Sequence, residues 1–313
     1  MDFALSPEQA ELAGTVRSVL TKQADPDAAW STLCDQIGVP ALAIPEKYDG
    51  VGATFFETAV VLEELGRAIA PAPLLATAVA TEALLAGGSA EAKERLLPRI
   101  AGGEVATLVT GDGPVLDADR ATILLAIDGD DLVEVTGATA TWVESMDQTI
   151  RLATVDRGTG TSTPVGDGAA ALARAELVGA AASAALAAGL CRRALDMTVA
   201  YSKERVQFGR PIGSFQALKH RMADMLARTE LTRSVAWSAA YALAQGADDA
   251  AEQVHAAASY ALDSAQHLAG ECIQLHGGIA ITWEHDAHLV FKRAHALGRL
   301  FGAAHAHRAA LSL

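Results

Sequence analysis

Two long Ala- and Leu-rich helical patterns meet at one short stretch of different composition, and this junction constrains the fold more than any other part of the sequence. It runs from Arg205 to Gln216 and holds two arginines, two glycines, one proline and two phenylalanines. Gly209 and Pro211 break the helix, because glycine relaxes the backbone and proline has no N–H. Paired guanidiniums can bind phosphate oxygens. The residues alone leave two alternatives, a helix connection with solvated arginines and an anion site.

The chain from residue 169 onward predicts a helical bundle. Long helices are expected over 175–201, 216–245, 248–275 and 288–311. Ala and Gly dominate the first of them, which lets helix backbones approach closely. Short connections favour antiparallel neighbours, so the pattern predicts an up-and-down four-helix bundle.

The first hundred residues predict a helical N-terminal domain. A helix start is predicted at Ser6-Pro7-Glu8-Gln9. Ser6 is the expected capping residue, Pro7 the first helical residue, and the Gln9 side chain is expected to cap the Ser6 backbone in return. Later apolar positions recur at helical spacing. The further helices are expected over 30–37, 55–70, 74–86 and 90–101.

A small β-domain is predicted between the two helical parts. Short β-branched runs at 106–109, 122–127, 132–135 and 149–155 are separated by Asp- and Gly-rich turns. Residues 158–164 and 166–168 are expected to form a loop or linker. The predicted fold is therefore mainly α with a small β-domain, and the expected domain boundaries are 1–104, 105–168 and 169–313.

Charge, cysteines and apolar runs exclude several classes of protein. The 313-residue chain has a formal net charge of −14, which disfavours nucleic acid or an anionic membrane as its main partner. Cys34, Cys191 and Cys272 are widely spaced, so we expect free buried thiols and neither a disulfide framework nor a zinc site. The N-terminus lacks a signal segment, and the apolar runs fall short of the roughly 20 residues that span a bilayer. We expect a cytoplasmic protein.

Two motifs resemble those of the acyl-CoA dehydrogenase family. The stretch from Tyr201 to Gln216 is similar to its flavin-contacting signature, and Gln274-Leu275-His276-Gly277-Gly278, followed by Trp283-Glu284-His285-Asp286, is similar to a second one. Residues 45–52 and 63–67 resemble its N-terminal pattern. The resemblance spans nearly the whole chain and is weakest over 105–168. It implies the family's architecture, with a helical N-domain, a reduced middle β-domain and a C-terminal four-helix bundle.

The resemblance also implies an FAD site shared across a subunit interface. Arg205 would bind the FAD pyrophosphate. Gln274, Gly277 and Gly278 would contact the adenosine end, where glycine lets backbone approach a nucleotide closely. The remaining contacts carried over by position are Gln207, Phe208, Ile212 and Phe215. Two alternatives stay open: the phenylalanines could be core residues, and the glycine pair could be a helix stop.

Glu284 is the catalytic residue that the resemblance implies. The family's base removes the α-proton of an acyl-CoA thioester while the β-hydride passes to flavin, and the product is a trans-2-enoyl thioester. Because the α-proton is weakly acidic, the base must be desolvated and the thioester carbonyl polarised. The sequence leaves open whether Glu284 is this base or a vestigial or helix-capping carboxylate.

The chain departs from the family pattern at two places. Residues 105–168 lack the Thr-Glu-Pro and Gly-Ser-Asp segments that hold the flavin ring, and Phe301-Gly302-Ala303 stands where Glu-Gly-Thr is usual. The resemblance is therefore strongest to the short subunit of α2β2 acyl-CoA dehydrogenases of actinobacterial sterol side-chain breakdown. A longer dehydrogenase subunit would hold the flavin ring. Electron-transfer flavoprotein is a further partner of the family.

Two alternatives to this function stay open. One is a self-sufficient homomeric dehydrogenase that uses Glu284, and the other is a structural or regulatory subunit without a cofactor. No metal site is expected, because His305 and His307 lie on different helix faces and no His-Glu-x-x-His pattern occurs. Surface or interface positions are expected for these histidines and for His285, His288 and His295.

Overall fold

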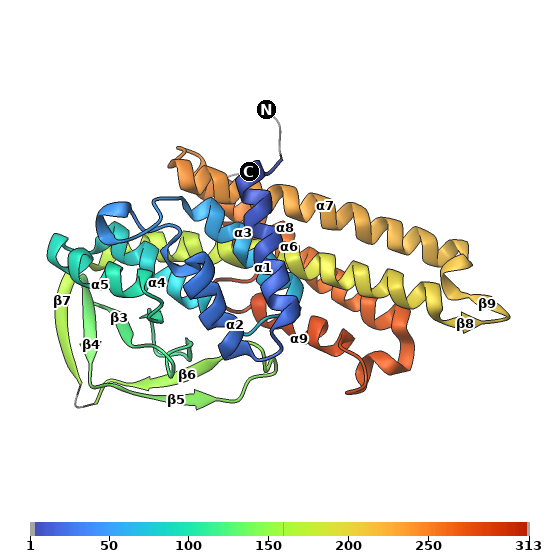
Figure 1. Cartoon of the computed structure of the whole chain (residues 1–313), viewed down its shortest axis with the longest axis horizontal. Coiled ribbons are helices and arrows are strands. Elements are labelled where there is room, and N and C mark those ends of the chain that lie inside the picture. Colours follow the sequence, from blue (N-terminus) through green and yellow to red (C-terminus); the bar gives the residue numbers. More distant parts are fainter. Residues whose placement is uncertain (1–3, 159, 312–313) are drawn as a thin grey trace. The chain divides into compact units, whose positions relative to one another are not determined.

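The computed structural model describes residues 4–158 and 160–311 (Figure 1). The α-helices are α1 (Pro7–Lys22), α2 (Pro26–Thr32), α3 (Phe55–Ala68), α4 (Leu74–Gly87), α5 (Ala90–Ala101), α6 (Gly168–Glu204), α7 (Gln216–Gln245), α8 (Ala250–His276), α9 (Ala287–Leu297) and α10 (Ala304–Ala309). The π-helix η1 (Leu33–Ile37) extends α2, and the 3-10 turns are η2 (Val39–Ala41), η3 (Glu46–Tyr48), η4 (Ile212–Ser214) and η5 (Gly277–Ile281). The strands are β1 (Ala106–Val109), β2 (Val115–Leu116), β3 (Ile123–Asp128), β4 (Asp131–Thr136), β5 (Thr139–Val143), β6 (Leu152–Asp156), β7 (Thr161–Asp167), β8 (Val206–Gln207) and β9 (Arg210–Pro211).

The predicted architecture of N-terminal helices, a small sheet region and C-terminal helices is confirmed. By backbone packing the chain forms two compact units. The N-terminal unit comprises Leu5–Val61 and Pro71–Gly179, and the C-terminal unit comprises Leu62–Ala70 and the chain from Ala180 onward. The predicted division into three domains, with boundaries at 104 and 168, stays a prediction. Residues 1–3, 159 and 312–313 of these domains lie outside the described residues.

Side-chain caps begin several helices of the N-terminal unit where the sequence predicts them. The Ser6 hydroxyl accepts a hydrogen bond from the Gln9 N–H at 3.2 Å, and the Gln9 side-chain oxygen accepts one from the Ser6 N–H at 2.9 Å. This reciprocal pair satisfies two N–H groups that an α-helix leaves free at its start. Ser89 caps α5 with its hydroxyl alone, which accepts a hydrogen bond from the Ala92 N–H at 3.1 Å.

Two small sheets lie in the N-terminal unit, one in the order β1-β3-β4-β7 and one in the order β2-β6-β5. β1 pairs with β3 in parallel and the other neighbours are antiparallel. The predicted loop or linker at 158–164 and 166–168 is wrong where β7 forms, while Thr159 lies outside the described residues. β7 tolerates Pro164 because it is an edge strand, where a proline can leave one side unpaired, and the register shifts opposite it.

Long helices build the C-terminal unit, and α7 and α8 run beside each other (Figure 1). α7 has the predicted bounds, and α6 begins earlier than expected. The single helix predicted over 288–311 is wrong, since the chain leaves α9 at Gly298 and turns before α10 begins. Gly302 in this turn has φ +103°, a conformation that other residues rarely adopt.

The middle of α6 is buried on every side, from Val178 to Cys191. Among the described residues, α6 is also the one helix long and apolar enough to span a bilayer, and 61% of its apolar window lies inside the structure. Its backbone meets that of α3 in the C-terminal unit. A Cβ added at Gly189 would lie 1.8 Å from the Glu63 carbonyl oxygen, and one at Gly66 would lie 2.1 Å from the Leu186 carbonyl oxygen. These positions therefore require glycine.

Substituting Gly189 with alanine is expected to destabilise the chain. Because the added methyl group meets a backbone carbonyl, α3 or α6 must shift, at a cost of about 1–3 kcal/mol in the free energy of unfolding. Gly270→Ala is the matched control, since Gly270 lies inside α8 with no atom within 4 Å of an added Cβ. There alanine is expected to stabilise by about 0.5–1 kcal/mol. Urea denaturation checks both signs, and equal effects would contradict the close approach.

Candidate functional site

The predicted anion-binding stretch folds into a β-hairpin at the end of α6 (Figure 1). Val206 pairs with Pro211 and Gln207 with Arg210. The two turn residues, Phe208 and Gly209, have φ of +52° and +78°. Positive φ at both positions characterises the tight turn whose twist matches that of paired strands. Phenylalanine is strained in this conformation, because its Cβ crowds the backbone.

Backbone contacts attach the hairpin to α6. The Arg205 N–H donates to the Tyr201 carbonyl at 2.9 Å, and the Ile212 N–H donates to the Arg205 carbonyl at 2.8 Å. A Cβ at Gly213 would lie 2.8 Å from the Ser202 carbonyl oxygen, so η4 packs directly on the last turn of the helix. The position of Arg205 is thus set by α6.

The side chains of the hairpin are mostly exposed. No residue among 4–158 and 160–311 forms an ion pair with the Arg205 guanidinium, and Gln207 is also exposed. The guanidinium of Arg210 lies 4.0 Å from the centre of the Phe215 ring, and Phe208 meets that ring edge-on at 6.1 Å. Phe208 is 91% exposed, so it is not a core residue.

The second predicted motif ends α8 with open backbone. Gly277 has φ +66° and follows the last helical residue, His276, so it is a helix stop. A Cβ at Gly277 or Gly278 would meet no atom within 4 Å. Gln274 is exposed as well. The turn therefore offers an accessible backbone where a nucleotide could lie close.

Glu284 lies on an exposed turn between η5 and α9. Its N–H donates to the Thr282 hydroxyl at 3.3 Å, and its neighbour Trp283 is 74% exposed. The carboxylate accepts no hydrogen bond from the part of the chain that the structure describes. Glu284 thus lacks, within this chain, the desolvation that a base for a weak carbon acid needs.

Three rings connect the two motifs. Tyr201 of α6 stacks on His276 of α8 with ring centres 4.5 Å apart and an interplanar angle of 29°. His285 contacts the same His276 ring at 4.4 Å and meets Tyr201 edge-on at 6.0 Å. The three predicted groups, around Arg205, Gly277 and Glu284, therefore converge on this contact. Sequence reasoning gave Tyr201 and His276 no role, although each lies inside one of the two motifs.

These residues fit part of a flavin dinucleotide. An unpaired guanidinium and an open glycine backbone suit a diphosphate and the adjoining nucleoside, since charged donors and accessible N–H groups bind phosphate oxygens. Ile212 and Phe215 are half-buried beside them. Every other predicted contact is exposed to solvent on the surface of the C-terminal unit. The predicted contacts thus form one surface, and a dinucleotide bound to it would have its other side open to solvent.

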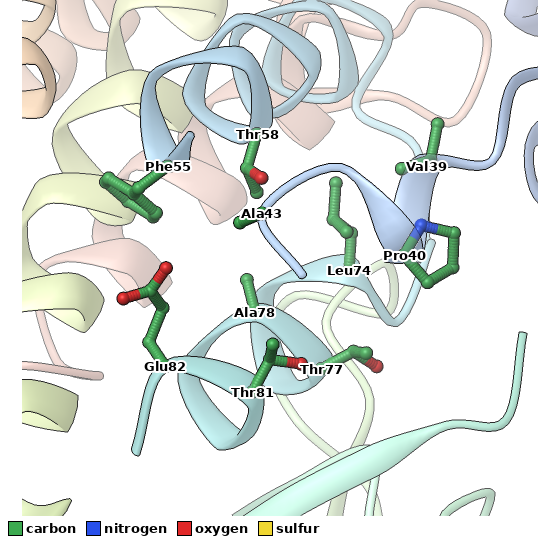
Figure 2. Close-up of a pocket in the computed structure, with 10 residues that line it drawn as sticks. All are labelled: Val39, Pro40, Ala43, Phe55, Thr58, Leu74, Thr77, Ala78, Thr81 and Glu82. Carbon is green, nitrogen blue, oxygen red and sulfur yellow. The ribbon is translucent and has the colours of Figure 1, made fainter. Parts of the chain in front are cut away.

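A pocket of the N-terminal unit is lined by none of the predicted site residues (Figure 2). Its empty volume is about 260 Å³ including the opening to solvent. The hydroxyls of Thr77 and Thr81 face no hydrogen-bond partner among the described residues. Glu82 forms an ion pair with Arg174 at 2.6 Å. Apolar side chains make up most of the remaining wall: Val39, Pro40, Ala43, Phe55, Leu74 and Ala78, beside Thr58.

Within residues 4–158 and 160–311, no three His, Cys, Asp or Glu side chains gather as a metal site would require. The surface or interface position expected for His307 is wrong, since it is buried and its Nδ1 lies 3.0 Å from that of His255. Cys191 and Cys272 are free and buried as expected, and burial raises the pKa of their thiols to about 12 and about 11. The expectation of a buried thiol is wrong for Cys34, which is free but only half-buried.

Comparisons with known proteins agree with the two motifs. Family models described as the N-terminal and C-terminal domains of acyl-CoA dehydrogenase match residues 6–104 and 166–312. Acyl-CoA dehydrogenase IpdE2 of Mycolicibacterium smegmatis is 42% identical over 95% of this chain and 96% of its own length. Acyl-CoA dehydrogenase FadE34 of Mycobacterium tuberculosis is 37% identical over 85% of this chain, but over 39% of its own length.

Solved structures extend the likeness to the fold. A variant of the steroid ACAD Tcur3481-Tcur3483 superimposes with a TM-score of 0.86 at 27% identity, covering 97% of this chain and 96% of that one. The ChsE4-ChsE5 complex from Mycobacterium tuberculosis gives a TM-score of 0.86 at 23% identity, covering 99% and 97%. At 23% identity, the likeness to the ChsE4-ChsE5 complex is evidence for the fold alone.

At two adjacent residues of the hairpin turn, we expect substitutions to change the free energy of unfolding in opposite directions. Phe208→Asn is expected to raise the free energy of unfolding by up to about 1 kcal/mol, because asparagine tolerates positive φ and the lost ring is exposed. Gly209→Ala is expected to lower it by about 1 kcal/mol, since the added Cβ meets no atom and only the φ opposes it. Denaturation of both variants checks the signs. A clear loss in Phe208→Asn would contradict the strained, exposed turn.

Proposed function

This chain belongs to the acyl-CoA dehydrogenase family of FAD-dependent oxidoreductases, and we propose that it is the shorter subunit of a hetero-oligomeric enzyme. The proposed reaction is the α,β-dehydrogenation of a bulky acyl-CoA thioester, with a steroid side-chain ester as its substrate class. A longer dehydrogenase subunit is the proposed partner, and an electron-transfer flavoprotein the proposed electron acceptor. A cytoplasmic location belongs to the same proposal.

One observation carries this proposal: all the predicted FAD contacts except Ile212 and Phe215 are exposed on one surface. Arg205 is exposed with no ion-pair partner among the described residues, and Gly277 and Gly278 face open space. A cofactor bound here alone would keep one side in water, which weakens charged hydrogen bonds and leaves a reactive ring unprotected. A second chain that covers this surface removes both problems.

The relatives support a two-part enzyme. FadE34 matches this chain over 39% of its own length, so most of that polypeptide lies outside the match. ChsE4-ChsE5 is a complex of two named chains, and Tcur3481-Tcur3483 is likewise a pair of names, described as a steroid ACAD. These printed names support both the partner and the substrate class that we propose.

Each predicted contact would make its own contribution. Arg205 would donate two hydrogen bonds to the diphosphate and compensate its charge. Gly277 and Gly278 would let backbone lie against the adenosine, and Gln274 would add a polar contact. Phe208, Gln207, Ile212 and Phe215 would line the edge of the cofactor nearest the hairpin. Bound FAD supplies the acceptor for the substrate hydride.

We assign the base to the partner subunit. Glu284 is exposed, and its neighbour Trp283 is 74% exposed. A carboxylate in water has little driving force to remove a thioester α-proton. Glu284 is therefore proposed to be an exposed carboxylate beside the predicted FAD contacts. Its role as base belongs to the alternative, a homomeric enzyme.

The Arg205→Ala variant tests the predicted FAD contacts. Hydrogen bonds to charged groups contribute about 1.5–3 kcal/mol, so the FAD dissociation constant of the assembled enzyme should rise roughly tenfold to a hundredfold. Arg205→Lys should recover part of the loss, because it keeps the charge but not the paired donors. Lys22→Ala, an exposed cation at the end of α1, is the control. Unchanged flavin binding in Arg205→Ala would favour a structural subunit without a cofactor.

The Glu284→Gln variant tests the location of the base. In the enzyme assembled with its longer partner, kcat should stay within about twofold of the parent value, because a general base contributes roughly 10²- to 10⁴-fold and this one is assigned to the partner. The measurement is acyl-CoA-dependent reduction of an artificial electron acceptor. A loss of about a hundredfold or more would return the role of base to Glu284.

A further inference from the structure

The ring contact of Tyr201, His276 and His285 joins three elements that would otherwise end separately. Tyr201 lies in the last turn of α6, His276 is the last residue of α8, and His285 precedes α9. His276 is 4% exposed, while the other two rings are half-buried. A buried ring that contacts two others fixes the relative position of the segments that carry them.

Hydrogen bonds fix the orientation of two of these rings. The Nδ1 of His276 lies 2.7 Å from the Cys272 carbonyl oxygen, and since a carbonyl can only accept, Nδ1 carries the proton. The Nδ1 of His285 lies 3.2 Å from the Ala287 N–H and accepts from it. Burial lowers the pKa of His276, which favours the neutral form of the stacked ring. Both rings are thereby fixed before any ligand binds.

Tyr201 and His276 are each one covalent or hydrogen-bonded step from a predicted flavin contact. The carbonyl of Tyr201 accepts from the Arg205 N–H at 2.9 Å, and Gly277 directly follows His276. The contacts that connect the Arg205 hairpin to the Gly277-Gly278 turn therefore pass through the Tyr201–His276 stack. Within the described residues, no other ring contact or ion pair links the hairpin to the end of α8.

We propose that Tyr201, His276 and His285 are positioning residues that hold the Arg205 hairpin and the Gly277-Gly278 turn in one fixed arrangement toward the FAD diphosphate. They would act through Arg205 and the glycine turn, without contact with substrate or cofactor. This inference rests on the proposed function. It adds that the two motifs act as one binding element, because a diphosphate contacted from both sides needs their spacing set in advance.

A first experiment needs no cofactor and uses the full chain alone. In Tyr201→Leu, amide hydrogen exchange over residues 205–212 should become about tenfold faster, because the hairpin loses its ring support. Tyr201→Phe keeps the ring and should exchange as the parent does. Tyr241→Leu is the matched control, since Tyr241 is half exposed on α7 and lies outside the cluster. Parent-like exchange in Tyr201→Leu would overturn the inference.

A second experiment measures FAD binding to the assembled enzyme by quenching of flavin fluorescence. His276→Ala and Tyr201→Leu should each weaken binding by about tenfold, and Tyr201→Phe should restore it. If the rings act through Arg205, adding Tyr201→Leu to Arg205→Ala should cause almost no further loss, as expected for coupled residues. Additive losses would show an effect unrelated to positioning and would overturn the inference.

The two experiments separate this inference from the function on which it rests. If Arg205→Ala leaves FAD binding unchanged, the proposed function fails, whatever the ring variants do. If Arg205→Ala weakens binding but Tyr201→Leu and His276→Ala do not, the function stands and the positioning role fails. Weaker binding in all three, with no additivity, supports both.

Discussion

The close approach of α3 and α6 is the constraint from which the functional end of the molecule is built. At Gly189 and Gly66 the two backbones lie so near that a methyl group would overlap a carbonyl oxygen. Residues Val178 to Cys191 are consequently buried all round. A helix that is packed on every side has one position, so the turn that follows it has one as well. The position of Arg205 at the end of α6 therefore depends on this packing.

The same helix also explains why the cation lies exposed. α6 ends at Glu204, and a two-residue turn reverses the chain before α7 begins. Such a hairpin has no room for a core of its own, so its side chains face solvent or one another, as the Arg210–Phe215 contact illustrates. A guanidinium at this point remains free for an anion. Combined with the glycine turn after α8, it forms the surface on which we propose that FAD and a second chain bind.

Sequence reasoning located the elements of the fold well where periodicity was strong. The Ser6 cap, the start of α5 and both ends of α7 follow from local signals that no packing overrides. It failed where packing decided: β7 forms as an edge strand despite its proline, and Gly298 and Gly302 divide the last helix. The short strands β2 and β5 were missed because their residues show little alternation.

The candidate site was predictable as a set of residues but not as a geometry. The motifs named Arg205, the hairpin residues, the glycine pair and Glu284. The assignment of the first three as flavin contacts remains a proposal, and Glu284 as base belongs to the homomeric alternative. What the sequence could not give is the Tyr201–His276 stack, because the two residues are 75 positions apart and contact depends on how α6 and α8 pack. The exposure of Glu284 likewise depends on the neighbours that a linear motif does not specify.

The flavin content of the purified chains tests the central claim most directly. The chain would be expressed alone and together with a longer acyl-CoA dehydrogenase subunit, and bound FAD would be counted against the amount of each chain. The account predicts no retained flavin in the chain alone and one flavin for each pair of unlike chains in the complex. A chain that purifies alone with a full complement of FAD and oxidises acyl-CoA would contradict it.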